Sequence, residues 1–95
     1  MTQEEINTLA TMHGLEPSKQ HVGSDERCRF FLTKDISARR YYQASISYGG
    51  PSEMVEVHVG LYGDRKIADD GQKSYASLDL AITDVPARFA RLRGL

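Results

Sequence analysis

The sequence predicts a small α+β domain in which a three-stranded antiparallel meander is packed on one face by an N-terminal helix and a C-terminal helix (α-β-β-β-α). Near both ends of the chain, apolar residues recur every three or four positions, which is typical of amphipathic helices. Between Arg27 and Tyr62 the hydrophobic period changes to two, which is typical of half-buried strands. A length of 95 residues suffices for one hydrophobic core, so we expect a single domain over residues 1–95.

The first helix is predicted at about residues 3–13. Thr2 and Glu5 have the spacing of a capping box, in which a hydroxyl and a carboxylate accept hydrogen bonds from the free amides at the start of a helix. Gly14 is followed by an apolar residue, which is typical of a helix end. Residues 16–26 contain a proline and a glycine and show no periodicity, so we expect a connecting loop there.

Three strands are expected between Arg27 and Tyr62. Turn signals near residues 36–38 and at residues 49–52 separate them, the second being Gly-Gly-Pro-Ser. Because both connections are short, neighbouring strands should pair antiparallel as a meander. The residues expected to face the core are Cys28, Phe30, Leu32, Tyr42, Ala44, Ile46, Tyr48, Val55, Val57, Val59 and Leu61.

The C-terminal third of the chain is harder to interpret. Residues 63–73 are mostly polar and are expected to form a mobile loop. Residues 74–84 fit both a strand and a helix, and we favour a helix because the inward face of the sheet needs a second apolar cover. Pro86 should kink this helix or begin another one, capped by Thr83 or Asp84.

Composition excludes several classes of protein. Lys and Arg number 12 and Asp and Glu number 13, so no long-range field attracts nucleic acid, and binding to phosphates would need a local patch. Cys28 is the only cysteine, which rules out an internal disulfide and fits a reducing compartment. The polar N-terminus has no signal-peptide pattern, and no apolar run is long enough for a membrane helix. We therefore expect a cytoplasmic protein without membrane contact.

Residues capable of catalysis occur without a catalytic pattern. Cys28 shares a predicted strand face with core residues, so its thiol should be buried and unreactive. His13, His21 and His58 do not have the spacing of metal ligands. The chain also lacks a Gly-x-Ser-x-Gly motif and glycine-rich phosphate loops. We therefore predict a protein that is not an enzyme, with no catalytic residues, no cofactor and no metal.

The outward face of the predicted sheet is the most unusual feature. Its three aromatic residues are more than solubility requires, and large aromatic side chains beside arginine are typical of the centres of protein interfaces. The alternative is that these aromatics form cross-strand pairs or lie under the loop at residues 63–73. The predicted partner-binding residues are Arg29, Phe31, Tyr41, Gln43, Glu56, His58 and Tyr62.

Arginine residues keep a second class of function open. A nucleic-acid-binding domain predicts that one face gathers Arg29, Arg39, Arg40, Arg88, Arg91 and Arg93. The last three are also explained by a favourable interaction with the dipole of a C-terminal helix. Glu56 and the nearly neutral net charge argue against a nucleic-acid platform on the sheet.

The order helix, three strands, helix, with Gly50-Pro51 between two strands, resembles that of double-stranded RNA-binding domains. The resemblance extends over most of the chain. That family holds phosphates with a lysine-rich start to its last helix, and the corresponding residues 72–76 offer only Lys73. The resemblance therefore implies the fold without the RNA-binding activity, and we do not assign the chain to the family.

Taken together, these patterns favour a small non-enzymatic protein-binding module. Its expected partner is a larger protein or protein complex, on which it would act as an inhibitor, an adaptor or an immunity-type protein. Phage-encoded inhibitors of bacterial defence complexes have this general character. Two alternatives stay open beside nucleic-acid binding. One is a small enzyme with His58 or His21 against a carboxylate in a pocket, and the other is a homodimeric ligand-binding domain.

Overall fold

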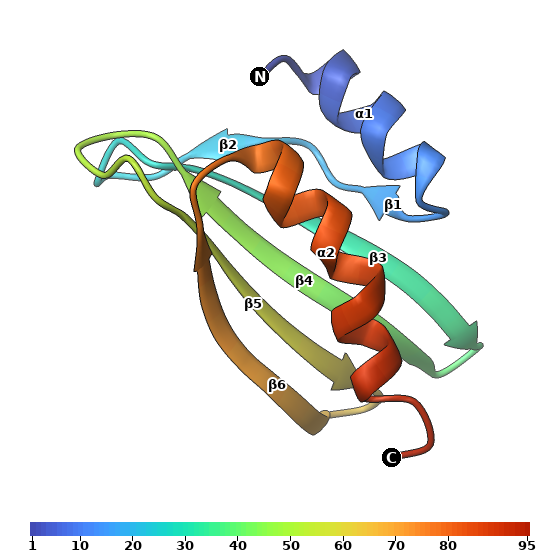
Figure 1. Ribbon diagram of the computed structural model, residues 1–95. Helices are drawn as coiled ribbons and strands as arrows, with labels where there is room; N and C mark the ends of the chain where they lie inside the picture. The colour runs from blue at the N-terminus through green and yellow to red at the C-terminus, as the bar shows by residue number, and fades with distance from the viewer.

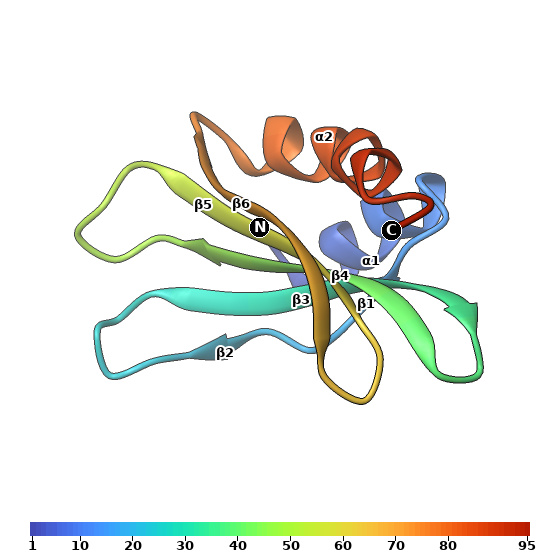
Figure 2. The same ribbon diagram turned by 90° about the horizontal axis from the view of Figure 1, so that it is seen from below.

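The computed structural model describes residues 1–95 as a six-stranded antiparallel sheet with two helices on one of its faces, which confirms the α+β class (Figures 1 and 2). The strands lie in the order β1-β3-β4-β5-β6, and β2 also pairs with β3. In chain order the elements are α1 (Gln3–Met12), β1 (Glu16–Pro17), β2 (His21–Val22), β3 (Cys28–Ser37), β4 (Arg40–Tyr48), β5 (Val55–Tyr62), β6 (Lys66–Tyr75) and α2 (Leu78–Arg91).

Helix α1 begins with the predicted capping box. The Glu5 amide donates to the Thr2 hydroxyl at 3.1 Å, and the Thr2 amide donates to the Glu5 carboxylate at 3.2 Å. These hydrogen bonds to Thr2 lower the pKa of Glu5, so the carboxylate stays charged at the positive end of the helix dipole. The helix ends one residue earlier than predicted, with His13 as its C-cap and Gly14 at a φ of 69°.

The three central strands pair as predicted. Ile46 of β4 lies between Phe30 of β3 and Val57 of β5, and all three are buried under the helices. Cys28, whose thiol was expected to be buried, is only half-buried. The core consists of Ile6, Ala10, Leu15, Phe30, Leu32, Ala44, Ile46, Val55, Val57, Val59, Leu61, Tyr75, Ala81, Ile82, Val85, Phe89 and Leu92.

The expectation of a mobile loop at residues 63–73 is wrong. Strand β6 pairs with β5 along its length, so the sheet has one more long strand than predicted. The hydrophobic alternation of β6 is hidden because its register with β5 shifts twice, and because Gly71, at a φ of 76°, occupies a position that faces the helices. Residues 16–26, also expected to be loop, contain the two short strands β1 and β2.

The C-terminal helix begins at Leu78, later than the start near residue 74 that the sequence predicts. Residues 74 and 75 end β6, and the Ser77 hydroxyl then caps α2 by accepting a hydrogen bond from the Leu80 amide at 3.2 Å. The caps expected at Thr83 or Asp84 do not form, because both residues lie inside the helix.

Helix α2 continues through Pro86 without a second start. A proline inside a helix removes one hydrogen bond and costs about 3 kcal/mol. Ile82, Val85 and Phe89 on the same helix are buried against the sheet, and burial of three large apolar side chains is enough to offset that cost. No helix in the structure combines the length and the apolar character needed to cross a membrane.

Candidate functional site

One face of the sheet carries no helix. Both α1 and α2 lie on the opposite face, as Figure 2 shows edge-on. We call the uncovered surface of β3, β4, β5 and β6 the open face. Because side chains alternate along a strand, the pairing that buries Phe30, Ile46 and Val57 turns their neighbours to the open face. These neighbours include the seven residues expected on the outward face: Arg29, Phe31, Tyr41, Gln43, Glu56, His58 and Tyr62.

Two tyrosines form the largest aromatic feature of the open face. Tyr41 and Tyr62 are cross-strand partners whose rings stack with centroids 5.6 Å apart and an interplanar angle of 17°. The Tyr62 ring also lies over Gly60, where an added Cβ would be 2.8 Å from a ring carbon. Gly60 therefore makes room for the ring, and both aromatic positions are fixed by the sheet.

Phe31 lies apart from the tyrosines. Its cross-strand partner is Ser45, whereas Tyr41 is paired with Asp35, four residues farther along β3. At about 3.4 Å per residue this separates Phe31 from the tyrosines by roughly 14 Å. The three aromatics of the predicted face thus form two separate groups, and Phe31 has 37 % of its surface exposed.

Ion pairs hold several charged side chains at the open face and its margins. Arg29 donates two hydrogen bonds to Asp25, at 3.0 and 2.6 Å, and this contact holds the pKa of the Asp25 carboxyl well below its usual range. Asp69 contacts Lys66, the main cause of its lowered pKa, and His58 through Nε2 at 2.9 Å. The open face is thereby a network of paired charges around the aromatic side chains.

Residues of β6 extend the open face beyond the predicted set. Lys66 and Asp69 join His58, and the Gln72 amide donates to Glu56 at 2.9 Å. The sequence offers no signal for them, since residues 63–73 contain no regular alternation of apolar and polar residues.

The arginines expected to converge in a nucleic-acid-binding protein do not do so. Arg29 lies near the start of β3, and Arg39 and Arg40 lie at the turn that follows its other end. Arg88 is buried, with 1 % of its surface exposed, and is bound to Asp70. It therefore has no surface to offer a phosphate or an acidic partner.

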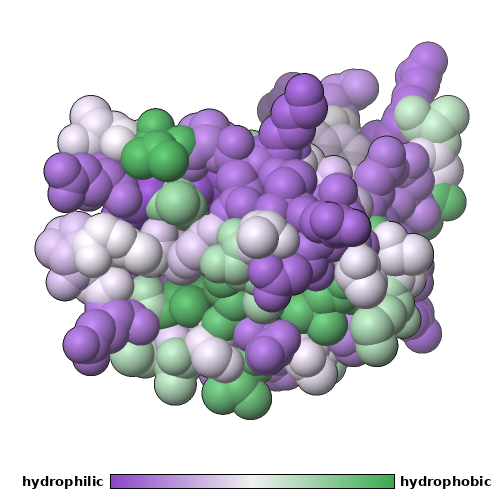
Figure 3. Space-filling model, turned by 90° about the horizontal axis from the view of Figure 1, so that it is seen from above, coloured by the Kyte–Doolittle hydropathy of each residue, from purple (hydrophilic) through white to green (hydrophobic).

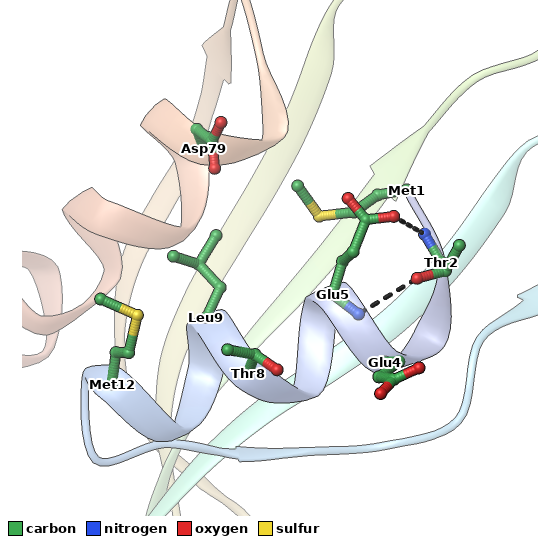
Figure 4. A pocket seen from close by; sticks show the side chains of 8 residues that line it. All are labelled: Met1, Thr2, Glu4, Glu5, Thr8, Leu9, Met12 and Asp79. Atoms are coloured by element: carbon green, nitrogen blue, oxygen red, sulfur yellow. Dashed lines mark hydrogen bonds between the residues drawn. The ribbon is translucent and has the colours of Figure 1, made fainter.

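A hollow lies on the helix side, between α1 and the start of α2 (Figure 4). It measures about 470 Å³, and its lining consists of Met1, Thr2, Glu4, Glu5, Thr8, Leu9, Met12 and Asp79. The carboxylates lie in the first turns of the two helices, where a favourable interaction with the helix dipoles accounts for them. Figure 3 shows the molecule from above the view of Figure 1, and the hydrophobic side chains on that side form small patches separated by hydrophilic ones.

Residues that could support catalysis are not gathered in a cavity. His58 does contact a carboxylate, that of Asp69, but on the open face, and the five main hollows contain no histidine in their linings. His21 is exposed on β2. No group of three or more His, Cys, Asp or Glu side chains is arranged to hold a metal ion.

Comparison with known proteins does not identify a family for this chain. No family model matches the chain, and no curated protein or solved structure is significantly similar to it. The order helix, three strands, helix that resembles double-stranded RNA-binding domains is interrupted by β6, which stands between the meander and α2.

Proposed function

We propose that this chain is a small non-enzymatic protein-binding module that uses the open face to occupy a surface of a larger protein or protein complex, as an inhibitor or an adaptor does. The observation that supports this best is the stack of Tyr41 and Tyr62 on a face that no other element covers. Rigid aromatic side chains bury much area on binding and lose little conformational entropy, which is why they dominate the energetics of protein interfaces.

The surroundings of the aromatics also suit an interface. The row between Phe31 and the tyrosines consists of Thr33, Gln43 and Gly60, and Ser45 lies beside Phe31. None of these is a large apolar residue, so a partner can approach the sheet closely. The charged side chains at the margins already have partners, such as Asp25 for Arg29, and are therefore largely ordered before binding. Ordering in advance reduces the entropic cost of association.

An affinity pulldown from lysate of the native host tests the proposal. We expect the wild type to retain one protein or complex in stoichiometric amount, and a variant with Phe31→Ala, Tyr41→Ala and Tyr62→Ala to lose it. Because Tyr62 also covers Gly60, a second variant, Ser45→Arg, tests the same face by adding bulk without removing any packing. Circular dichroism would confirm that both variants fold.

The matched control removes the same number of exposed apolar side chains from other surfaces. Met12→Ala, Val22→Ala and Leu80→Ala suit this purpose, since these residues are 74 %, 67 % and 58 % exposed and none lies on the open face. This control should retain the partner. Equal retention by wild type, open-face variants and control, or retention of nucleic acid alone, would contradict the proposed function.

A further inference from the structure

A hollow lined by arginines lies at the end of the sheet where two hairpins turn. The β3–β4 and β5–β6 turns are neighbours there, since Tyr41 and Tyr62 are paired immediately beside them (Figure 1). The hollow measures about 340 Å³, and we call it the arginine hollow. Its lining consists of Arg39, Arg40, Gly63, Asp64, Arg65 and Ile67.

The two hairpins that line the arginine hollow lie close together. A Cβ added at Gly63 would lie 3.3 Å from the carbonyl oxygen of Arg39 in one turn and 3.2 Å from Ile67 in the other. A side chain at position 63 would therefore crowd both neighbours, which means that the two hairpins lie close together here. The spacing between the arginines of the two turns is therefore set by the sheet rather than by flexible loops.

Positive charge exceeds negative charge in the arginine hollow, whose lining contains three arginines and one carboxylate, that of Asp64. Arg39, Arg40 and Arg65 form no ion pair with a carboxylate, not even with Asp64 in the same lining. Arg40 donates a hydrogen bond to the main-chain oxygen of Leu95, the last residue of the sequence, at 3.5 Å, and the side chains of Arg39 and Arg65 donate none within the protein.

At the opposite end of the sheet the pattern is reversed. Arg29 is paired with Asp25, and Arg27 lies 4.0 Å from Glu56. The arginines at that end are thus neutralised within the molecule, whereas those of the arginine hollow can take an external anion.

The arginine hollow adjoins the aromatic part of the open face. Arg40 directly precedes Tyr41, and Tyr62 directly precedes Gly63. We infer that the partner of the open face presents an acidic segment, whose carboxylates bind in the arginine hollow while its neighbouring apolar residues contact the tyrosine stack. This inference names the chemistry of the partner and rests on the proposed function.

An acidic protein segment fits this surface better than nucleic acid. A nucleic acid strand needs cations along its track, because each phosphate carries a charge. Here the unpaired arginines occupy one end of the open face, and carboxylates such as Glu56 and Asp69 lie along the rest. A short run of Glu or Asp residues in a protein partner carries its charge in one place. It can therefore bind in the arginine hollow without cations along the rest of the open face.

Titration with a labelled oligoglutamate peptide tests the inference without knowledge of the partner. We expect binding at low ionic strength that weakens as salt is added, with amide chemical-shift changes at residues 37–41 and 62–66. A variant with Arg39→Gln and Arg65→Gln should bind the peptide about tenfold more weakly. The matched control, Lys19→Gln with Lys73→Gln, removes the same charge outside the arginine hollow and should change the affinity less than about twofold.

Two comparisons separate the possible outcomes. Stronger binding of oligothymidylate than of oligoglutamate, or equal loss of oligoglutamate binding in both double variants, would overturn the acidic-segment inference. In the pulldown, a partner that is lost with Ser45→Arg but kept with Arg39→Gln and Arg65→Gln would overturn this inference while leaving the proposed function standing. Peptide binding at the arginine hollow without any captured partner would support the acidic ligand and contradict the proposed function.

Discussion

At the scale of single residues, the Arg88 side chain connects three elements of the fold. Its Nε donates to the Asp70 carboxylate at 2.8 Å, its Nη1 to the Val57 carbonyl at 2.9 Å and its Nη2 to the Gly71 carbonyl at 2.6 Å. One guanidinium thus joins α2, β5 and β6. Burying an arginine is costly unless all its donors are satisfied, and no buried side-chain polar atom in this protein lacks a partner.

Replacing Arg88 with methionine should lower the free energy of unfolding by about 3–5 kcal/mol, because the largely buried Asp70 carboxylate would keep only the exposed Arg91 as a charged partner. Urea unfolding followed by circular dichroism measures this change. The matched control is Arg91→Met, since Arg91 approaches the same carboxylate at 3.5 Å but is 57 % exposed in its side chain. This control should cost less than about 1 kcal/mol. Similar losses in the two variants would show that Arg88 does not hold the helix to the sheet.

At the scale of elements, the sequence predicts those parts of the fold whose signal is local. Helix α1 follows from the capping box of Thr2 and Glu5, and the central strands follow from their alternation. Strand β6 does not, because it is held by pairing with β5 and by hydrogen bonds from Arg88, a residue of α2 that follows it in the chain. Contacts of this kind leave no periodic pattern in a sequence.

The sequence predicts which residues lie on the open face but not which of them are neighbours there. Alternation alone places Phe31, Tyr41 and Tyr62 on one side of the sheet. Which of them are neighbours depends on the register, which the turn geometry fixes and the sequence pattern does not. The arginine hollow likewise exists only because the two hairpin turns lie side by side.

Gly71 gives β6 its bend, and its replacement tests the strand directly. At a φ of 76° an L-residue is strained, and no atom lies within 4 Å of an added Cβ, so the cost of substitution is purely conformational. We expect Gly71→Ala to lower the free energy of unfolding by about 1 kcal/mol and Gly71→Asn by about half as much, since asparagine tolerates this region better. Urea unfolding of both variants measures the difference. Equal stability of all three proteins would mean that residue 71 is not held at positive φ.

At the scale of the whole molecule, the two edges of the sheet differ. The β3 edge is partly covered by β1 and β2, whereas β6 has no neighbour on its outer side. An exposed edge invites pairing with a second chain. Here the carbonyls of Asp70 and Gly71 are occupied by Arg88, and the register shifts between β5 and β6 interrupt the regular spacing that an added strand requires.

We therefore expect a monomer of 10.6 kDa in sedimentation equilibrium from micromolar to millimolar concentrations. Lys73→Val removes a charge from residues 71–75, the part of β6 that pairs with β5 without a register shift. It should raise the tendency to associate, because charged side chains on an edge strand oppose pairing. A wild-type dimer that Lys73→Glu dissociates would show that β6 is an interface after all. A wild-type dimer that Ser45→Arg dissociates would instead place a second copy of the chain on the open face, and the partner sought there would then be the protein itself.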